Sequence, residues 1–285
     1  MTVDHVVGLR DGRSLSYAQY GDPAGFPIVN AHGGLACRLD VEAAAPVAEQ
    51  CGVRLISPDR PGVGGSDPQP GRTILDWARD VGELLELLGI ERFAAMGWSL
   101  GGQYAAAVGY ALAPRVMRVA IIAGPPPLTE KRTFDGLPTM DRTFIGLSRR
   151  APWLARLCFR SMAFTATAAP GLWGRIAGGG LGEADAAVVR GEGYDAFARL
   201  TREALRQPQG VVEEYKIMIQ PWGFLPEDLR VPVDVWAGTD DQLLDSKWPA
   251  ELAERIPDAT MHLMAGGHFL AHLYYREIFD SLTRP

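Results

Sequence analysis

The sequence has few cysteines, no long apolar run and no basic excess, and each absence excludes a class of protein. Its three cysteines, Cys37, Cys51 and Cys158, show no CxxC spacing, so neither a disulfide framework nor a zinc site is indicated. No segment approaches the roughly 18 consecutive apolar residues that a membrane-spanning helix needs. With 28 Lys and Arg against 34 Asp and Glu, the net charge is -6, which offers no basic surface to a nucleic acid.

The first residues, MTVDHVVGLRDGRSLSY, also lack the charged start, apolar stretch and small-residue cleavage site of a signal peptide. We therefore expect a soluble, cytoplasmic protein that acts on a small molecule, with no nucleic-acid or membrane partner. No feature of the sequence indicates an oligomeric state. The composition is ordinary for a globular protein: 47% of the 285 residues are hydrophobic and 22% are charged.

Strand and helix patterns alternate in the first 125 residues and return near the C-terminus. Short apolar runs predict strands, and segments with apolar residues at helical spacing predict helices between them. The predicted strands cover residues 27–32, 54–59, 92–97, 116–123, 231–237 and 260–264. The predicted helices cover residues 41–51, 73–88, 101–112, 248–255 and a final segment from residue 269. This alternation predicts an α/β fold with a mostly parallel sheet flanked by helices.

Residues 126–222 interrupt the alternation. Helix-like stretches follow one another there, separated by Gly- and Pro-rich joints such as APGLWG and GGGLG. These stretches are residues 140–149, 153–164, 184–189, 194–206 and 211–219. We predict a helical cap inserted at residues 126–222 into a core domain made of residues 1–125 and 223–285.

A G-x-S-x-G motif, Gly97-Trp98-Ser99-Leu100-Gly101, lies between a predicted strand and a predicted helix. A sharp strand-to-helix turn needs small residues on either side of the serine and projects its hydroxyl above the sheet. A chance glycine-serine turn would not be expected with this strand before it and this helix after it. The motif therefore predicts Ser99 as a nucleophile.

A serine hydroxyl is a weak nucleophile that needs an adjacent base, and the base needs a third group to orient it. Two segments with suitable residues, GTDD at 238–241 and GGHF at 266–269, each follow a predicted strand. Both therefore lie at the carboxyl edge of the sheet, where α/β folds build their sites. We predict His268 as the base. Asp240 and Asp241 are both candidates for the acid, with Asp245 as a more distant alternative.

Taken together, these motifs resemble those of the α/β-hydrolase fold family, in particular carboxylesterase-like serine hydrolases with a helical cap. The resemblance covers nearly all of the chain outside the insertion. Its other matching pieces are the opening DGRSLSYAQYGDP, the turn His32-Gly33-Gly34 and the loop DRPGVGGSD at 59–67. It implies Asp241 as the acid, and an oxyanion hole formed by the backbone N–H groups of Leu100 and Gly34. Relatives often read H-G-x-P-G at the turn, so Leu35 is an alternative second donor here.

The resemblance also implies a reaction. A Ser-His-Asp triad forms an acyl-enzyme, most simply from a small apolar carboxylic ester, with no cofactor or metal; Trp98 and Leu35 are expected to contact the substrate. Serine at the motif argues against haloalkane dehalogenases and epoxide hydrolases, which carry aspartate there. Three alternatives stay open: a carbon-carbon bond hydrolase, a proline iminopeptidase-like peptidase, and a ligand-binding member of the fold without turnover.

Two further histidines have simpler interpretations. His268 and His272 are four residues apart, a spacing that can hold a metal on a helix. His268 precedes the predicted helix, however, and no matching carboxylate cluster accompanies the pair, so no metal is predicted. His32 is expected to pack or hydrogen-bond beneath the proposed oxyanion turn.

Overall fold

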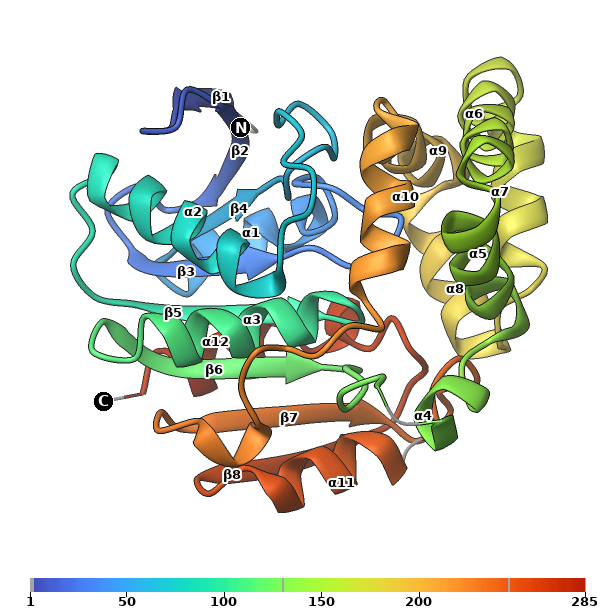
Figure 1. The fold of residues 1–285 in the computed structure, drawn as a ribbon. Coiled ribbons are helices and arrows are strands. Elements are labelled where there is room, and N and C mark those ends of the chain that lie inside the picture. The colour runs from blue at the N-terminus through green and yellow to red at the C-terminus, as the bar shows by residue number, and fades with distance from the viewer. Residues whose placement is uncertain (1–2, 130, 246, 285) are drawn as a thin grey trace.

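One sheet of eight strands organises the chain (Figure 1), and the computed structural model describes residues 3–129, 131–245 and 247–284. The strand order is β1-β2-β4-β3-β5-β6-β7-β8. The pairs β1–β2 and β2–β4 are antiparallel, and all the other pairs are parallel. The bounds are β1 Val3–Gly8, β2 Ser14–Gly21, β3 Phe26–Ala31, β4 Val53–Pro58, β5 Phe93–Trp98, β6 Val116–Ile122, β7 Val233–Gly238 and β8 Ala259–Met264. The α/β fold class predicted from the sequence is confirmed.

The six predicted strands correspond to β3 through β8, with ends that differ by one or two residues. Strands β1 and β2 were not predicted. They form an antiparallel hairpin at one edge of the sheet, in which Val7 pairs with Leu15. From Asp4 to Val7 in β1 the side chains alternate between exposed and half-buried, so this part of the strand carries no apolar run that would reveal it.

Helices cover both faces of the sheet. On one face lie α1 (Ala45–Gln50) and α12 (Ala271–Leu282), and on the other lie α2 (Ile74–Leu87), α3 (Gly101–Ala111) and α11 (Lys247–Arg255). A capping box begins α2, since Thr73 Oγ1 accepts from the Asp76 N–H and the Asp76 carboxylate accepts from the Thr73 N–H.

The helix expected at residues 41–51 is divided into two pieces. A short 3-10 turn, Glu42–Ala44, precedes α1, in whose first turn Pro46 lies. Proline lacks an N–H group and fits best in the first turn of a helix, so the regular helix begins beside it.

Between β6 and β7 the described residues contain no strand, seven α-helices and one short 3-10 helix, Pro226–Asp228. The α-helices are α4 Lys131–Asp135, α5 Thr139–Arg150, α6 Pro152–Ala168, α7 Pro170–Gly178, α8 Glu183–Glu192, α9 Tyr194–Ala204 and α10 Pro208–Ile217. Helices α5–α10, called the helical layer below, stack beyond the carboxyl ends of the parallel strands (Figure 1, right). The exact division of the chain at residues 126 and 222 stays a prediction.

One prediction within this segment is wrong. The sequence APGLWG was expected to be a joint between helices, but α7 begins inside it, at Pro170. Proline is well tolerated in the first turn, where its missing N–H would have had no partner in the helix. The neighbouring GGGLG does separate α7 from α8.

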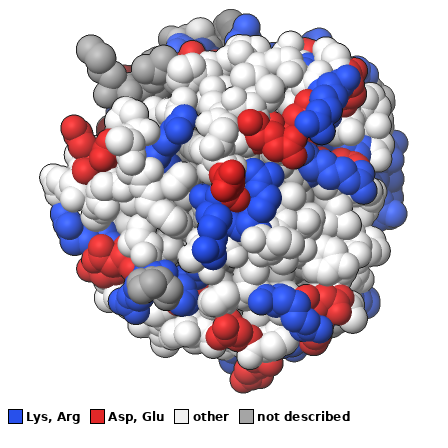
Figure 2. Space-filling model, turned by 90° about the vertical axis from the view of Figure 1, so that its left-hand side faces the viewer, with Lys and Arg blue, Asp and Glu red and all other residues white. Residues whose placement is uncertain are grey.

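The surface at the amino ends of the parallel strands, on the side away from the helical layer, has mixed charge. Figure 2 shows Lys and Arg side chains lying beside Asp and Glu over this face, with no broad area of one sign. Among the described residues, no helix combines the length and the apolar character that crossing a membrane requires.

Candidate active site

Ser99 lies in the tight turn between β5 and α3. Its φ is 54°, in the left-handed region that a non-glycine residue adopts only under constraint from its surroundings. The glycines of the motif make this turn possible. A Cβ at Gly101 would overlap the carbonyl oxygen of Ala31, and one at Gly97 would overlap the carbonyl oxygen of Gly101. The glycine spacing of the motif therefore follows from close backbone contact.

His268 connects the serine to a carboxylate. Its Nε2 lies 2.8 Å from Ser99 Oγ, and its Nδ1 lies 2.8 Å from Asp241 Oδ2. The imidazole is buried, with 5% of its side chain exposed. The structure thus brings together Ser99, His268 and Asp241, which come from the loops after β5, β8 and β7 respectively.

Asp240 and Asp245, the alternative acids, lie elsewhere. The Asp240 carboxylate is exposed and accepts a hydrogen bond from the Thr239 hydroxyl at 2.9 Å. Asp245 Oδ1 accepts from the N–H of Lys247, at the start of α11. Of the three candidates, Asp241 is the one in contact with His268.

Asp241 is held in its ionised form. Burial acts to raise the pKa of its carboxyl group, but the hydrogen bond with His268 and the N–H groups of Leu243 and Leu244 lower the pKa below its ordinary value. An ionised acid at Nδ1 favours the tautomer with a proton on that nitrogen. Nε2 is then free to accept the proton of the Ser99 hydroxyl.

The turn at residues 32–35 lies beside the serine and is held from below. Arg60 donates hydrogen bonds to the carbonyl oxygens of His32 and Gly33, and Asp40 accepts from the Gly33 N–H at 3.0 Å. His32 Nε2 accepts from the Arg60 N–H at 3.1 Å. Burial, then the charge of Arg60, lowers the pKa of His32 well below its usual range. The prediction that His32 hydrogen-bonds beneath the turn is confirmed.

Three backbone N–H groups close to Ser99 are free to bind a ligand. The N–H groups of Gly34, Leu35 and Leu100 donate to no other described residue, and all three residues line the cavity above the serine. Leu35 has a φ of 52°, and Leu100 directly precedes α3. Both predicted donors, Gly34 and Leu100, therefore lie at this cavity together with the alternative, Leu35.

A cavity of about 400 Å³ separates Ser99 and His268 from the helical layer. Trp98 and Leu35, the two predicted contact residues, both line it. The Trp98 indole N–H donates to the carbonyl oxygen of His268 at 2.7 Å, so this ring also supports the histidine loop. The opposite wall is mainly apolar and includes Leu137, Met140, Met162, Ile176, Phe197 and Leu205.

A buried ionic cluster, which no sequence motif indicated, joins α10 to this turn. Glu214 accepts hydrogen bonds from Arg60, from Arg72 and, at 3.4 Å, from the Tyr104 hydroxyl. Burial would raise the pKa of Glu214, but the two guanidinium groups lower it to about 2. Arg60 is the same residue that supports the turn at 32–35. These partners are far apart in sequence, and each alone resembles a charge on a solvated surface.

A second buried carboxylate of the helical layer contacts the histidine loop. Asp185 Oδ1, on α8, accepts from the N–H of Phe269 at 2.8 Å, next to His268. A Cβ at Gly267 would overlap this carboxylate, so the loop and α8 are in close contact. Asp185 was not singled out by any motif.

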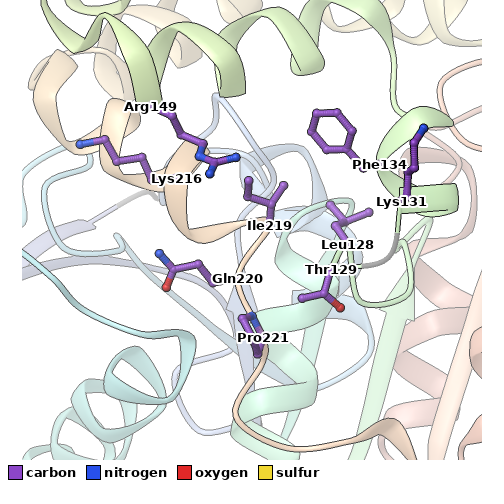
Figure 3. A pocket seen from close by; sticks show the side chains of 9 residues that line it. All are labelled: Leu128, Thr129, Lys131, Phe134, Arg149, Lys216, Ile219, Gln220 and Pro221. Carbon is purple, nitrogen blue, oxygen red and sulfur yellow. The ribbon is translucent and has the colours of Figure 1, made fainter.

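A larger, more open hollow of about 620 Å³ lies outside the helical layer, beside α4, α5 and α10 (Figure 3). Lys131 and Lys216 point to opposite sides, away from its centre, and Arg149 extends across it. The nine described residues that line it include no serine, cysteine or histidine. The cavity above Ser99 is therefore the better candidate for chemistry.

No cluster of three or more His, Cys, Asp or Glu side chains able to hold a metal occurs among the described residues. His268 faces Ser99 and Asp241, whereas His272 Nδ1 lies 3.4 Å from Glu192. The two histidines thus contact different groups.

Comparison with known proteins adds a family match and several structural matches. The family model described as alpha/beta hydrolase fold matches residues 27–273. A non-heme chloroperoxidase from Streptomyces lividans is 33% identical over 132 residues, which are 45% of this chain and 48% of that protein. The chain thus matches about half the length of this relative.

Two solved structures resemble almost the whole chain. A thermophilic esterase from Thermogutta terrifontis has a TM-score of 0.69 at 20% identity, covering 99% of this chain and 96% of its own. An epoxide hydrolase has a TM-score of 0.73 at 20% identity, covering 99% and 97%. At these identities the likeness establishes the shared fold.

Proposed function

The chain is an enzyme that belongs to the alpha/beta hydrolase fold family, and on this premise we propose that it is a serine hydrolase of small, largely apolar carboxylic esters. One observation carries the proposal. Two 2.8 Å contacts link Ser99 Oγ, His268 and Asp241 at the floor of a mainly apolar cavity.

In the proposed first step, Ser99 Oγ attacks the carbonyl carbon of the ester while His268 Nε2 takes its proton. Asp241 stabilises the imidazolium that forms. The negative charge that develops on the carbonyl oxygen is stabilised by the N–H groups of Leu100 and Gly34. His268 then returns the proton to the leaving alcohol, and the acyl group stays on Ser99.

In the proposed second step, a water molecule attacks the acyl carbon while His268 Nε2 takes one of its protons. The same N–H groups stabilise the second tetrahedral intermediate. Collapse of this intermediate breaks the bond to Ser99 Oγ, which regains its proton from His268. The carboxylic acid is released and the free enzyme is restored.

The cavity supports a substrate of modest size that carries no anionic group. Its described lining residues include no Lys or Arg, so it offers no side-chain cation to a phosphate or carboxylate group. A volume of about 400 Å³ lies within the usual range for small-molecule sites. Its apolar side chains are suited to an alkyl or aryl group next to the scissile carbonyl.

The proposal is tested with a fluorophosphonate probe and a panel of aryl esters of increasing acyl length. We expect the probe to label Ser99, and esters to be cleaved by the wild type and by Ser161→Ala but not by Ser99→Ala. Ser161 is an exposed serine on α6 and provides the matched control. Labelling at another residue, or ester cleavage by Ser99→Ala, would contradict the assignment.

The same panel separates the alternatives. Preferred cleavage of a vinylogous diketone would indicate carbon-carbon hydrolysis, and preferred cleavage of a proline arylamide would indicate a peptidase. Binding of a compound without cleavage would indicate a ligand-binding protein. The partial match to a non-heme chloroperoxidase favours chloroperoxidase activity as a second candidate function. This activity is tested by chlorination of an aromatic reagent in the presence of peroxide and chloride.

A further inference from the structure

The apolar wall of the cavity contains one carboxylate whose acceptor capacity is largely unused. Asp141, in the first turn of α5, lines the cavity on the side of the helical layer. Its Oδ1 accepts a hydrogen bond from the Tyr215 hydroxyl at 3.1 Å. Its Oδ2 accepts no hydrogen bond from any residue that the structure describes. A carboxylate can accept about four hydrogen bonds, so the described residues use only a small part of this capacity.

The other polar side chains of the cavity have partners within the protein. Ser99 and His268 contact each other, and Glu214 is bound by two guanidinium groups. The Thr201 hydroxyl donates to the Phe197 carbonyl oxygen and accepts from the indole N–H of Trp173. Among these polar side chains, the carboxylate of Asp141 therefore has the most unused acceptor positions for a ligand.

The surroundings of Asp141 leave its carboxylate partly removed from water. Burial raises the pKa of its carboxyl group, although the Tyr215 hydrogen bond and the nearby charge of His268 act to lower it. Tyr215 is 5% exposed, and its ring stacks on Phe159 and is tilted against Phe144, so the hydroxyl is held in place. No Lys or Arg among the described lining residues neutralises the carboxylate. A donor on the ligand would supply the missing partner.

We propose that Asp141 and Tyr215 form a polar subsite that binds a hydrogen-bond donor, a hydroxyl or an ammonium group, carried by the ester substrate away from its scissile carbonyl. The pair presents carboxylate and phenol oxygens as acceptors, because the phenol proton is already donated to Asp141. The substrate would thus be apolar along most of its length, with one donor. This inference rests on the proposed ester hydrolysis and adds the substrate class to it.

The test compares esters that differ in a single terminal group. Matched series carry a methyl, hydroxyl, primary ammonium or trimethylammonium group at the end of the acyl chain or of the alcohol chain, at increasing chain lengths. The trimethylammonium ester has the charge but no N–H, so it separates charge from hydrogen bonding. We expect the best donor ester to exceed its methyl counterpart in kcat/KM by about 10-fold to 100-fold in the wild type.

Variants at Asp141 test whether the preference for donor esters comes from this subsite. Asp141→Leu should remove the preference, so that donor and methyl esters are cleaved with similar kcat/KM. Asp141→Asn should keep part of the preference for hydroxyl and lose the preference for ammonium. Asp135→Asn makes the same chemical change at an exposed residue of α4 outside the cavity, and should behave as the wild type. Unfolding midpoints show whether each variant is folded.

Binding measurements separate this inference from the proposed function. Calorimetry with Ser99→Ala measures the affinity of intact donor and methyl esters without turnover. Ser99-dependent cleavage with equal rates for donor and methyl esters would overturn the subsite and leave the hydrolase proposal in place. A preference that persists in Asp141→Leu would also overturn the subsite. Tighter binding of donor esters without any cleavage would support the subsite and contradict the hydrolase proposal.

Discussion

The sheet edge and the helical layer face the same cavity but are built differently. At the sheet edge, Ser99, His268 and Asp241 come from loops at strand ends and form one hydrogen-bonded chain. In the helical layer the wall is mainly apolar, with the Asp141 carboxylate as an exception. The difference indicates that the proposed bond-breaking chemistry belongs to the sheet edge, and that the choice of substrate belongs to the helices.

Two buried contacts connect these regions. Glu214 of α10 binds Arg60, which supports the turn at 32–35, and Asp185 of α8 binds the N–H of Phe269 in the histidine loop. Through them the helical layer holds loops on either side of Ser99. Variants in each region measure how far the two regions act separately.

Ser99→Ala changes the sheet edge alone. It therefore tests most sharply whether the proposed chemistry belongs to the sheet edge and not to the helical layer. We expect kcat for the preferred ester to fall by about 10⁶-fold, because the nucleophile is lost while the cavity keeps its shape. Affinity for a non-cleaved ester should be unchanged in calorimetry. Substantial residual turnover would mean that another group supplies the nucleophile, and it would contradict the assignment of the chemistry to Ser99 at the sheet edge.

Within the sheet edge, Asp241→Asn should reduce kcat by about 10⁴-fold, because the amide no longer favours the productive tautomer of His268. Asp240→Asn, one residue away and exposed, should leave kcat nearly unchanged. Initial rates with one aryl ester compare the two variants directly. The opposite ranking would transfer the role of the acid to Asp240.

Glu214→Gln tests the first connection between the regions. Two buried guanidinium groups would lose their counter-charge, so we expect the free energy of unfolding to fall by about 3–5 kcal/mol in urea titrations. Glu213→Gln, the neighbouring residue on α10, should change it by less than about 0.5 kcal/mol. Equal losses in the two variants would mean that the cluster contributes no specific stability.

The same cluster should make stability depend on pH. The pKa of Glu214 is lowered in the folded protein from 4.5 to about 2, so its contribution is complete above pH 4.5 and is lost as the pH falls toward 2. The difference in unfolding free energy between the wild type and Glu214→Gln should therefore shrink over this range. A difference that stays constant down to pH 2 would contradict the assignment.

The smallest effect is expected for Asp185→Ala at the second connection. The N–H of Phe269 would lose its acceptor, and the histidine loop would lose its contact with α8. We expect kcat to fall by about tenfold through looser placement of His268, with KM changed less. Asp185→Asn, which can still accept through its amide oxygen, should recover part of the rate. A change confined to KM would place the role of Asp185 in substrate binding.

How much the sequence predicted depended on whether the signal was local. Strands β3 through β8 were predicted because each is a short apolar run, and Ser99 was singled out because its glycines lie within two residues of it. Strands β1 and β2 and helices α4 and α7 were missed. Of these, β1 is partly exposed, α4 is short and α7 begins with proline, and such segments carry weak periodicity. The turn GTDD left two acids open, because adjacent aspartates differ only in the direction that the folded loop gives them.

By itself, the sequence determined the α/β fold class and the serine and histidine that the loops bring together, because strand patterns and tight turns depend on near neighbours. The tertiary structure brought Asp241, the acid that the family resemblance implied, against His268, and it paired Glu214 with Arg60 across 154 positions. It also left Asp141 facing an apolar cavity. These outcomes depend on burial and on partners distant in the chain, since a carboxylate has the same sequence signature whether water or a guanidinium group surrounds it.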